Sequence, residues 1–228
     1  MAISEKVRAS MVVGNYIRKM FEVYYAEDSP IPAELEHKLE QIIREKSPQA
    51  DVTVVNDFGH GMITPRIRKA LEDNAKFLAL NTQTNSGNFG YNLVTNYRRA
   101  DYIAIDAPEA HLAAQNKFGD LASEVMPAIR SAVNCKRLIV THGGHGCYVS
   151  AGSDPVQHIP AFTKTVVDTV GAGDAFFAVT SPLVAAGVPM ELVGVIGNAA
   201  GALKVGIVGH RKSVEKVPLM KYLNTLLK

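Results

Sequence analysis

The chain has 228 residues, of which 47% are hydrophobic and 20% are charged, and its formal net charge is +2. This length suits one domain with a substantial core, so we expect a single domain over residues 1–228. The balanced charge argues against nucleic-acid binding and the apolar stretches are too interrupted to span a membrane, so we expect neither partner.

The N-terminus and the cysteines indicate the compartment. No charged segment followed by an apolar one opens the chain, as it would in a signal peptide. Cys135 and Cys147 lack the spacing of a metal site and are interpreted as free thiols. We therefore expect a cytoplasmic protein.

The first stretch, through Glu27, mixes apolar and charged residues without one clear period, and it favours neither helix nor strand. The next stretch, residues 33–45, places Leu35, Leu39 and Ile42 at helical spacing, which predicts an amphipathic helix.

From residue 52 onward, short apolar strands alternate with helical patterns. The predicted strands cover residues 52–57, 77–81, 102–106, 137–141, 146–150 and 156–159. The predicted helices begin at Thr64-Pro65, with Thr64 as the cap, and at Pro108-Glu109, and cover 121–132, 175–188, 189–206 and 217–227. This alternation predicts an α/β fold with a mostly parallel sheet covered by helices on both faces.

Polar residues directly follow several predicted strands. They are Asp57, Asn81, Asp106, Thr141 and the turn before Asp174, which follows a further strand predicted from the β-prone run that ends at Val167. Ligands in parallel sheets collect at the carboxyl ends of strands, so we expect a site there, with Asp57 and Asn81 as candidate substrate ligands.

The stretch Asp168–Phe176 joins a glycine-rich turn to a predicted helix. Its glycines allow a tight turn with backbone close to a ligand, and a helix N-terminus presents unpaired amides that suit phosphate. The carboxylate of Asp174 is either an ordinary charge of the first helical turn or a general base beside a phosphate site.

This stretch resembles the second signature of the PfkB, or ribokinase-like, family of carbohydrate kinases, which reads Asp-Thr-x-Gly-Ala-Gly-Asp. The resemblance implies a three-layer α/β/α ribokinase-like fold in which Asp174 is the catalytic base. The amides of Gly171, Ala172 and Gly173 would form the anion hole, and Asp168-Thr169 would belong to the nucleotide site. The alternative is a βα turn without a catalytic role.

A second segment, Thr141–Gly146, resembles the family's Thr-x-Gly-x-x-Gly turn, which approaches the nucleotide phosphates. The resemblance implies that Thr141, Gly143 and Gly146 bind ATP, whereas a plain turn between strands is the alternative. The two histidines of this turn, His142 and His145, are possible metal ligands. Two ligands on a turn seldom form a metal site without others.

Two further resemblances concern the metal and the adenine. Glu109 stands where the family's Asn-x-x-Glu motif has a glutamate associated with Mg²⁺, although an ordinary first-turn carboxylate is the alternative. Asn198, Gly201 and Gly209 lie in segments that resemble the small-residue helix and the turn that flank adenine. Close helix packing explains these small residues equally well.

The chain also departs from the family. Residues 57–61 resemble an Asp-Tyr-Gly-Lys-Gly segment of its heptose-phosphate kinase branch, with His60 in place of lysine. Residues 81–88 replace the usual Asp-Pro-Lys-Gly with a loop that suits either sugar hydroxyls or solvent. We find no counterpart of the family's first sheet strand, lid strands or Gly-Gly signature before Ser29, and therefore expect either a piece of a longer protein or a shortened member of the family.

These features predict an ATP- and Mg²⁺-dependent kinase of a sugar or sugar phosphate, nearest to the heptose-phosphate kinase branch. The alternative is a catalytically silent nucleotide-binding or scaffolding module of a larger protein, since some members of that branch are fused to a nucleotidyltransferase domain. Open sheet edges predict a homodimer.

Overall fold

The structure, a computed structural model, describes residues 5–13, 16–25, 29–85, 87–163, 165–209 and 211–226. Its strands are β1 (Glu5–Val13), β2 (Tyr16–Tyr25), β3 (Thr53–Asp57), β4 (Leu78–Thr82), β5 (Tyr102–Asp106), β6 (Arg137–Thr141), β7 (Cys147–Ala151) and β8 (Gln157–Ile159). Its helices are α1 (Ala33–Lys46), α2 (Pro65–Asn74), α3 (Ala107–Ala113), α4 (Met126–Ala132), α5 (Ala172–Ala185), α6 (Met190–Lys204) and α7 (Lys216–Leu226). Single 3-10 or π turns lie at Ser47–Gln49, Val94–Asn96, Leu121–Val125 and Gly143–His145.

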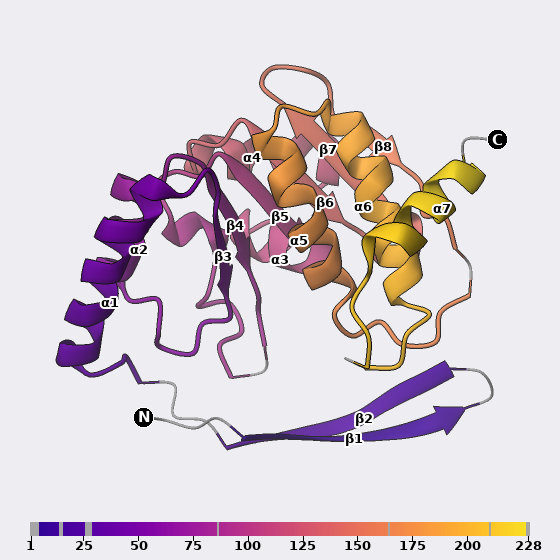
Figure 1. Ribbon diagram of the computed structural model, residues 1–228, viewed down its shortest axis with the longest axis horizontal. Coiled ribbons are helices and arrows are strands. Elements are labelled where there is room, and N and C mark those ends of the chain that lie inside the picture. Colours follow the sequence, from indigo (N-terminus) through magenta and orange to yellow (C-terminus); the bar gives the residue numbers. More distant parts are fainter. Residues whose placement is uncertain are drawn as a thin grey trace.

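The main sheet has six strands in the order β3-β4-β5-β6-β7-β8 (Figure 1). Strands β3 to β6 are parallel, and β7 and β8 add to them in antiparallel pairs. The residues of β4 and β5 are buried almost throughout, as expected for strands covered on both faces. The mostly parallel sheet predicted from the sequence is confirmed.

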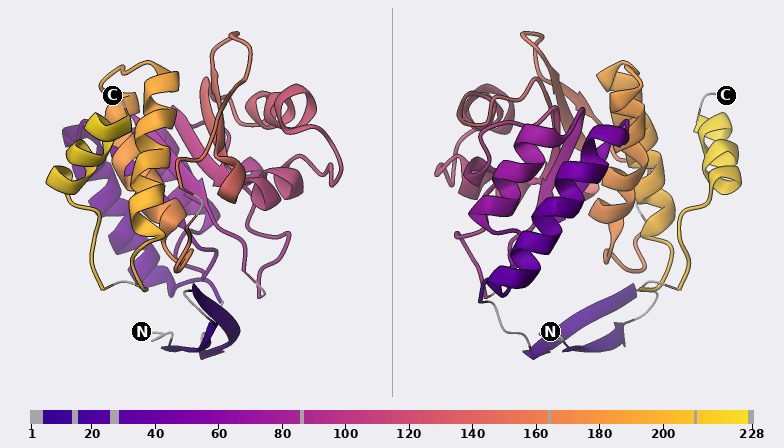
Figure 2. Two further views of the ribbon diagram at one scale, coloured as in Figure 1. Left: turned by 90° about the vertical axis from the view of Figure 1, so that its right-hand side faces the viewer. Right: turned by 60° about the vertical axis from the view of Figure 1, so that its left-hand side comes forward.

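Helices cover both faces of this sheet (Figures 1 and 2). On one face, Ile67 of α2 and Ile129 of α4 belong to a core with Leu80 of β4. On the other, Phe177 of α5 and Val193 of α6 belong to a second core, and α7 packs against α6. The predicted three-layer α/β/α architecture is therefore confirmed. None of the helices in the described part of the chain is both long and apolar enough to span a bilayer.

The predicted cap of α2 is also present, because Thr64 Oγ1 accepts a hydrogen bond from the Ile67 amide at 3.2 Å. Such a bond satisfies one of the amides that the first helical turn leaves unpaired.

Residues 5–13 and 16–25, for which the sequence favours neither helix nor strand, form an antiparallel pair. Strands β1 and β2 pair from Glu5↔Tyr25 to Val13↔Tyr16. This hairpin lies apart from the main sheet, beyond the carboxyl ends of its strands (Figures 1 and 2). The sequence shows no counterpart of the family's first sheet strand or lid strands before Ser29, and the structure places this pair of strands there.

The β-prone run that ends at Val167 is not a strand, and this prediction was wrong. Pro160 follows β8 and cannot donate to a sheet ladder. The amides of Val167 and Asp168 instead donate to the carbonyl oxygen of Val205, just after α6, at 2.8 and 3.0 Å. The turn before α5 is therefore anchored to the end of another helix.

Candidate functional site

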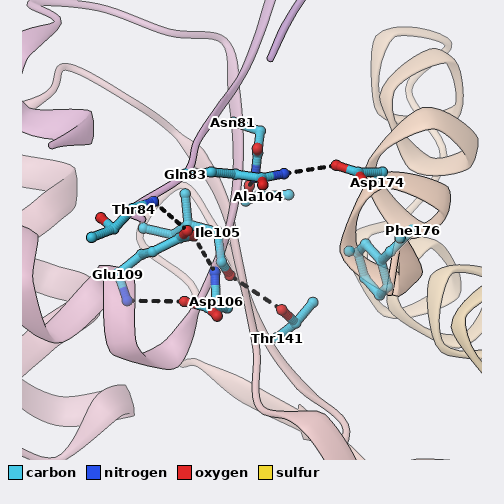
Figure 3. A pocket seen from close by; sticks show the side chains of 12 residues that line it. Asn81, Gln83, Thr84, Ala104, Ile105, Asp106, Glu109, Thr141, Asp174 and Phe176 are labelled. Carbon is cyan, nitrogen blue, oxygen red and sulfur yellow. Dashed lines mark hydrogen bonds between the residues drawn. The ribbon is translucent and has the colours of Figure 1, made fainter. Parts of the chain in front are cut away.

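Two adjoining cavities open at the carboxyl ends of the parallel strands, beside the N-terminus of α5. Cavity A has a volume of about 260 Å³ and cavity B a volume of about 300 Å³. Both are lined by Asp106, Thr141, Gly173 and Phe176. Of the residues that follow predicted strands, the structure brings Asn81, Asp106, Thr141 and Asp174 together around cavity A (Figure 3).

The turn before α5 presents amides to these cavities. Gly171 caps the helix with φ 75° and ψ 11°, a left-handed conformation that favours glycine. In the described part of the chain, the amides of Gly171 and Gly173 have no hydrogen-bond acceptor, whereas that of Ala172 donates to the Thr169 carbonyl at 3.2 Å. The amides of Gly171 and Gly173 can therefore bind an anion, and that of Ala172 is already engaged.

The Asp174 carboxylate lies in cavity A and is held by one neighbour. Gln83, in the loop after β4, donates from Nε2 to Asp174 Oδ1 at 2.7 Å (Figure 3). The backbone of Gln83 is fixed as well, since its amide donates to Asp57 O at 2.8 Å and its carbonyl accepts from Asn92 Nδ2 at 3.1 Å. Sequence reasoning did not select Gln83, although its place after a strand carboxyl end is a signal that could have found it.

Asp106 and Glu109 lie across cavity A from Asp174 (Figure 3). Asp106 Oδ1 accepts from the Glu109 amide at 2.9 Å, and Glu109 Oε2 accepts from the Asp106 amide at 3.1 Å, which forms a capping box at α3. The Thr84 amide donates to Glu109 Oε1 at 3.0 Å. Burial raises the pKa of Glu109, the charge of Asp106 raises it further, and burial also raises the pKa of Asp106.

A divalent cation fits this pair of carboxyl groups. Mg²⁺ is commonly held by one or two carboxylates together with phosphate oxygens and water. No three His, Cys, Asp or Glu side chains converge as a metal cage among the described residues, so the phosphates and water would complete the coordination. A nearby cation would also offset the cost of burying two acids side by side.

Cavity B combines a polar mouth with an apolar interior. The mouth is lined by Thr141, Gly143, Gly146 and Thr169. The interior is lined by small residues of α6 and by larger apolar side chains that include Phe162 and Val166. Asn198 and Gly201 of α6 also line this cavity. The side chain of Asn198 donates from Nδ2 to the carbonyl oxygens of Ile159 and Pro160, at 3.0 and 2.9 Å. A flat ring fits beside Gly201, where an added Cβ would meet no atom within 4 Å.

Three of the candidate residues line neither cavity. Asp57 is buried and accepts from Tyr97 Oη at 2.9 Å and from the Gly59 amide at 2.9 Å. Asp168 is also buried, and its carboxylate accepts from the amides of Val170 and Gly209. This geometry does not support a substrate contact by Asp57. It does not support nucleotide contacts by Asp168 and Gly209 either. The hydrogen bonds of these three residues instead hold the loops that surround the site.

Residues 66–217, most of the chain, match the family model of pfkB family carbohydrate kinases. The chain belongs to the pfkB family. The family predicted from the sequence is thus confirmed.

The bifunctional protein HldE of Nitrobacter winogradskyi is 29% identical over 181 residues, which cover 78% of this chain and 36% of that protein. The bifunctional protein HldE of Nitrobacter hamburgensis is 28% identical over 207 residues, which cover 89% and 41%. This chain therefore spans less than half the length of these relatives. Their similarity agrees with the heptose-phosphate kinase branch that the sequence indicates.

Solved structures of pfkB-type kinases show the same fold. Phosphofructokinase-2 from Escherichia coli, in complex with potassium, superimposes with a TM-score of 0.73 at 15% identity, over 91% of this chain and 67% of that one. Ribokinase from Thermotoga maritima gives 0.67 at 16% identity, over 96% and 69%. At these identities the likeness shows the ribokinase-like fold alone.

Proposed function

We propose that this chain, as one kinase domain, transfers the γ-phosphoryl group of ATP to a hydroxyl of a sugar or sugar phosphate. The position of Asp174 carries the proposal. Its carboxylate lies in cavity A, beside the available amides of Gly171 and Gly173 and across from Glu109 (Figure 3). Membership of a carbohydrate kinase family supports the same reaction class.

Asp174 acts as the general base of this reaction. It accepts the proton of the acceptor hydroxyl as the hydroxyl oxygen bonds to the γ-phosphorus. The bond from that phosphorus to the bridging oxygen breaks, and ADP leaves. The amides of Gly171 and Gly173, together with the positive end of the α5 dipole, stabilise the charge on the phosphoryl group in transfer. Mg²⁺, held by Glu109 with Asp106, would supply further neutralisation of the phosphates.

Cavity B binds the nucleotide. Its apolar interior, which includes Phe162 and Gly201, suits the adenine ring, and its mouth at Thr141 and Gly143 points the phosphates toward Gly173. Since Gly173 lines both cavities, the γ-phosphate reaches cavity A at this residue.

Cavity A binds the acceptor, and two buried oxygen atoms support a hydroxyl-rich one. Asn81 and Thr84 line this cavity, and their buried Oδ1 and Oγ1 atoms have no hydrogen-bond partner among the described residues. Buried polar atoms are nearly always paired, so such orphans suit ligand hydroxyls. A sugar or sugar phosphate is the acceptor that this supports.

The open sheet edge at β3 supports a homodimer as the assembly. Val54 of this edge strand is 47% exposed, and an unpaired strand edge readily pairs with another chain. Light scattering that finds a monodisperse monomer would contradict the dimer.

A catalytically silent nucleotide-binding module is the second candidate. The loss of two family lysines favours it, because His60 and the loop of residues 81–88 replace fixed cations that would bind phosphate.

Calorimetry and turnover together test the two candidates. Binding of ADP with Mg²⁺ is measured first, and ADP release from ATP is then followed with a panel of sugars and sugar phosphates that includes heptose phosphates. The kinase proposal predicts ADP release that depends on one class of acceptor. Nucleotide binding without turnover across the panel would support the silent module, and a failure to bind nucleotide would overturn both.

A further inference from the structure

A buried lysine outside both cavities lies directly behind the phosphate-binding turn. Lys204 is the last residue of α6 and is only 5% exposed. Its ammonium donates to the carbonyl oxygens of Val170 and Gly209, at 2.8 and 2.6 Å. These two residues belong to separate turns, the one that leads into α5 and the one that follows α6. The side chain thus joins the two turns from behind.

Asp168 binds the same two residues from their amide side. Its Oδ1 accepts from the Val170 amide at 3.0 Å, and its Oδ2 accepts from the Gly209 amide at 2.8 Å. The backbones of Val170 and Gly209 are therefore each held by a carboxylate at the N–H and by an ammonium at the carbonyl oxygen. We call these four residues the peptide clamp.

Within the clamp, Lys204 places a positive charge behind the anion site and opposite the carboxylate of Asp168. Val170 precedes Gly171, whose amide is available to a phosphate. A buried carboxylate such as Asp168 is costly without a cation nearby, and a cation behind the turn also favours an anion in front of it. Lys204 lies at the C-terminal end of α6, where the helix dipole favours a cation.

The ligands of this ammonium are of the kind that an alkali-metal ion uses. Backbone carbonyl oxygens replace the water shell of K⁺ in proteins, and here two such oxygens from different turns converge on one nitrogen. We propose that the Lys204 ammonium is a built-in monovalent cation, which closes the turn before α5 and makes a bound alkali-metal ion unnecessary there. Lys204 is a positioning residue in this proposal, because it acts on phosphate through Val170 and the amides that follow. Its effect on phosphate rests on the proposed function, whereas its effect on cation dependence does not.

Replacement of the lysine tests the proposal by rescue. Thermal unfolding and ADP affinity are measured in KCl, NH₄Cl and tetramethylammonium chloride at equal ionic strength. The wild-type protein should give the same midpoint and the same affinity in all three salts. Lys204→Ala opens a space lined by the two carbonyls, and it should lower the midpoint by roughly 10 °C and the ADP affinity by about tenfold in tetramethylammonium. K⁺ or NH₄⁺ should restore a large part of both, since these ions fit between the carbonyls.

Two variants serve as controls. Lys204→Met fills the space with an uncharged side chain and should lose affinity without rescue by K⁺. Lys136→Ala, at an exposed position, should behave as the wild type.

Three results would overturn the proposal. One is a wild-type midpoint or ADP affinity that rises with K⁺, because a built-in cation leaves no such need. Another is an ADP affinity of the Lys204→Ala variant in tetramethylammonium chloride that equals the affinity of the wild type. The third is equal loss in the Ala and Met variants with no rescue of either, which would make the lysine a packing residue. If Lys204→Ala does not fold, the wild-type salt series and the Met variant still decide. A lack of turnover with every acceptor would defeat the proposed function and leave these measurements intact.

Discussion

The contact between Gln83 and Asp174 is predicted to orient the catalytic base, and its removal should lower the rate. Gln83→Leu deletes the donor that lies 2.7 Å from Asp174 Oδ1. A hydrogen bond to a charged group contributes roughly 1.5–3 kcal/mol when it is shielded from water. Both side chains are partly exposed here, so we take about 1–1.5 kcal/mol, which corresponds to about a tenfold fall in kcat/KM. ADP affinity should stay unchanged, because cavity B does not include Gln83.

The chain offers a matched control and a sharper variant. Gln157 donates from Nε2 to Glu191 Oε1 at the same 2.7 Å, on an exposed surface of β8 and α6, so Gln157→Leu deletes the same kind of bond away from the site. Gln83→Glu places a second carboxyl group against Asp174. The two should share a proton at neutral pH, which removes the base and costs about a hundredfold in kcat. Steady-state kinetics with saturating ATP measure all three variants. The reasoning is refuted if Gln83→Leu is as active as Gln157→Leu, or more active than the wild type.

Three further predictions concern stability. The raised pKa of Glu109, from 4.5 to about 8, means that the folded metal-free chain keeps a proton that the unfolded chain releases, so stability should fall as pH rises from 4.5 to 8. Urea unfolding at several pH values should show this fall, and the fall should be smaller in Glu109→Gln, where Asp106 alone keeps a raised pKa; an equal slope in both proteins would contradict it. Tyr97→Phe removes the hydroxyl that donates to buried Asp57 and should cost about 1–3 kcal/mol in urea unfolding while turnover of the folded protein is retained, whereas a loss of kcat would place Asp57 in the site. Gly146→Ala should destabilise the fold by about 1–3 kcal/mol, since φ is 97° and an added Cβ would collide with the Ile159 carbonyl; unchanged unfolding would show that the turn adapts.

Much of the fold follows from local sequence patterns. The β-branched run at 52–57 and the apolar runs at 102–106 and 137–141 form strands within a residue of the predicted bounds. The Thr64 cap and the glycine turn before α5 are also local features, set by residues next to one another in the chain.

Features that depend on distant contacts could not be predicted in this way. The segment around Val167 has strand-like residues but bonds to Val205, and the sequence does not encode that choice locally. Gln83 and Asp174 are 91 positions apart, and Lys204 and Val170 are 34 apart, so only the folded chain brings each pair together. In the sequence Lys204 appears merely as a charge within an apolar helix, and its place behind the turn follows from the packing of α6 against α5.

The hairpin β1–β2 illustrates a third limit. Its residues alternate imperfectly, because the register shifts between Ala9 and Ser10, and a period of two is broken there. Such a break hides a strand from pattern reasoning.

The central claim is that Asp174 takes the proton of the acceptor hydroxyl at a site built from the turn before α5. Asp174→Asn keeps the size and loses the basic oxygen, and Asp154→Asn, in an exposed loop, is the matched control. With the acceptor that supports ADP release by the wild type, the account predicts that kcat falls by about a thousandfold in Asp174→Asn, that ADP binding is retained, and that Asp154→Asn is unaffected. Turnover in Asp174→Asn within a few-fold of the wild type would contradict it.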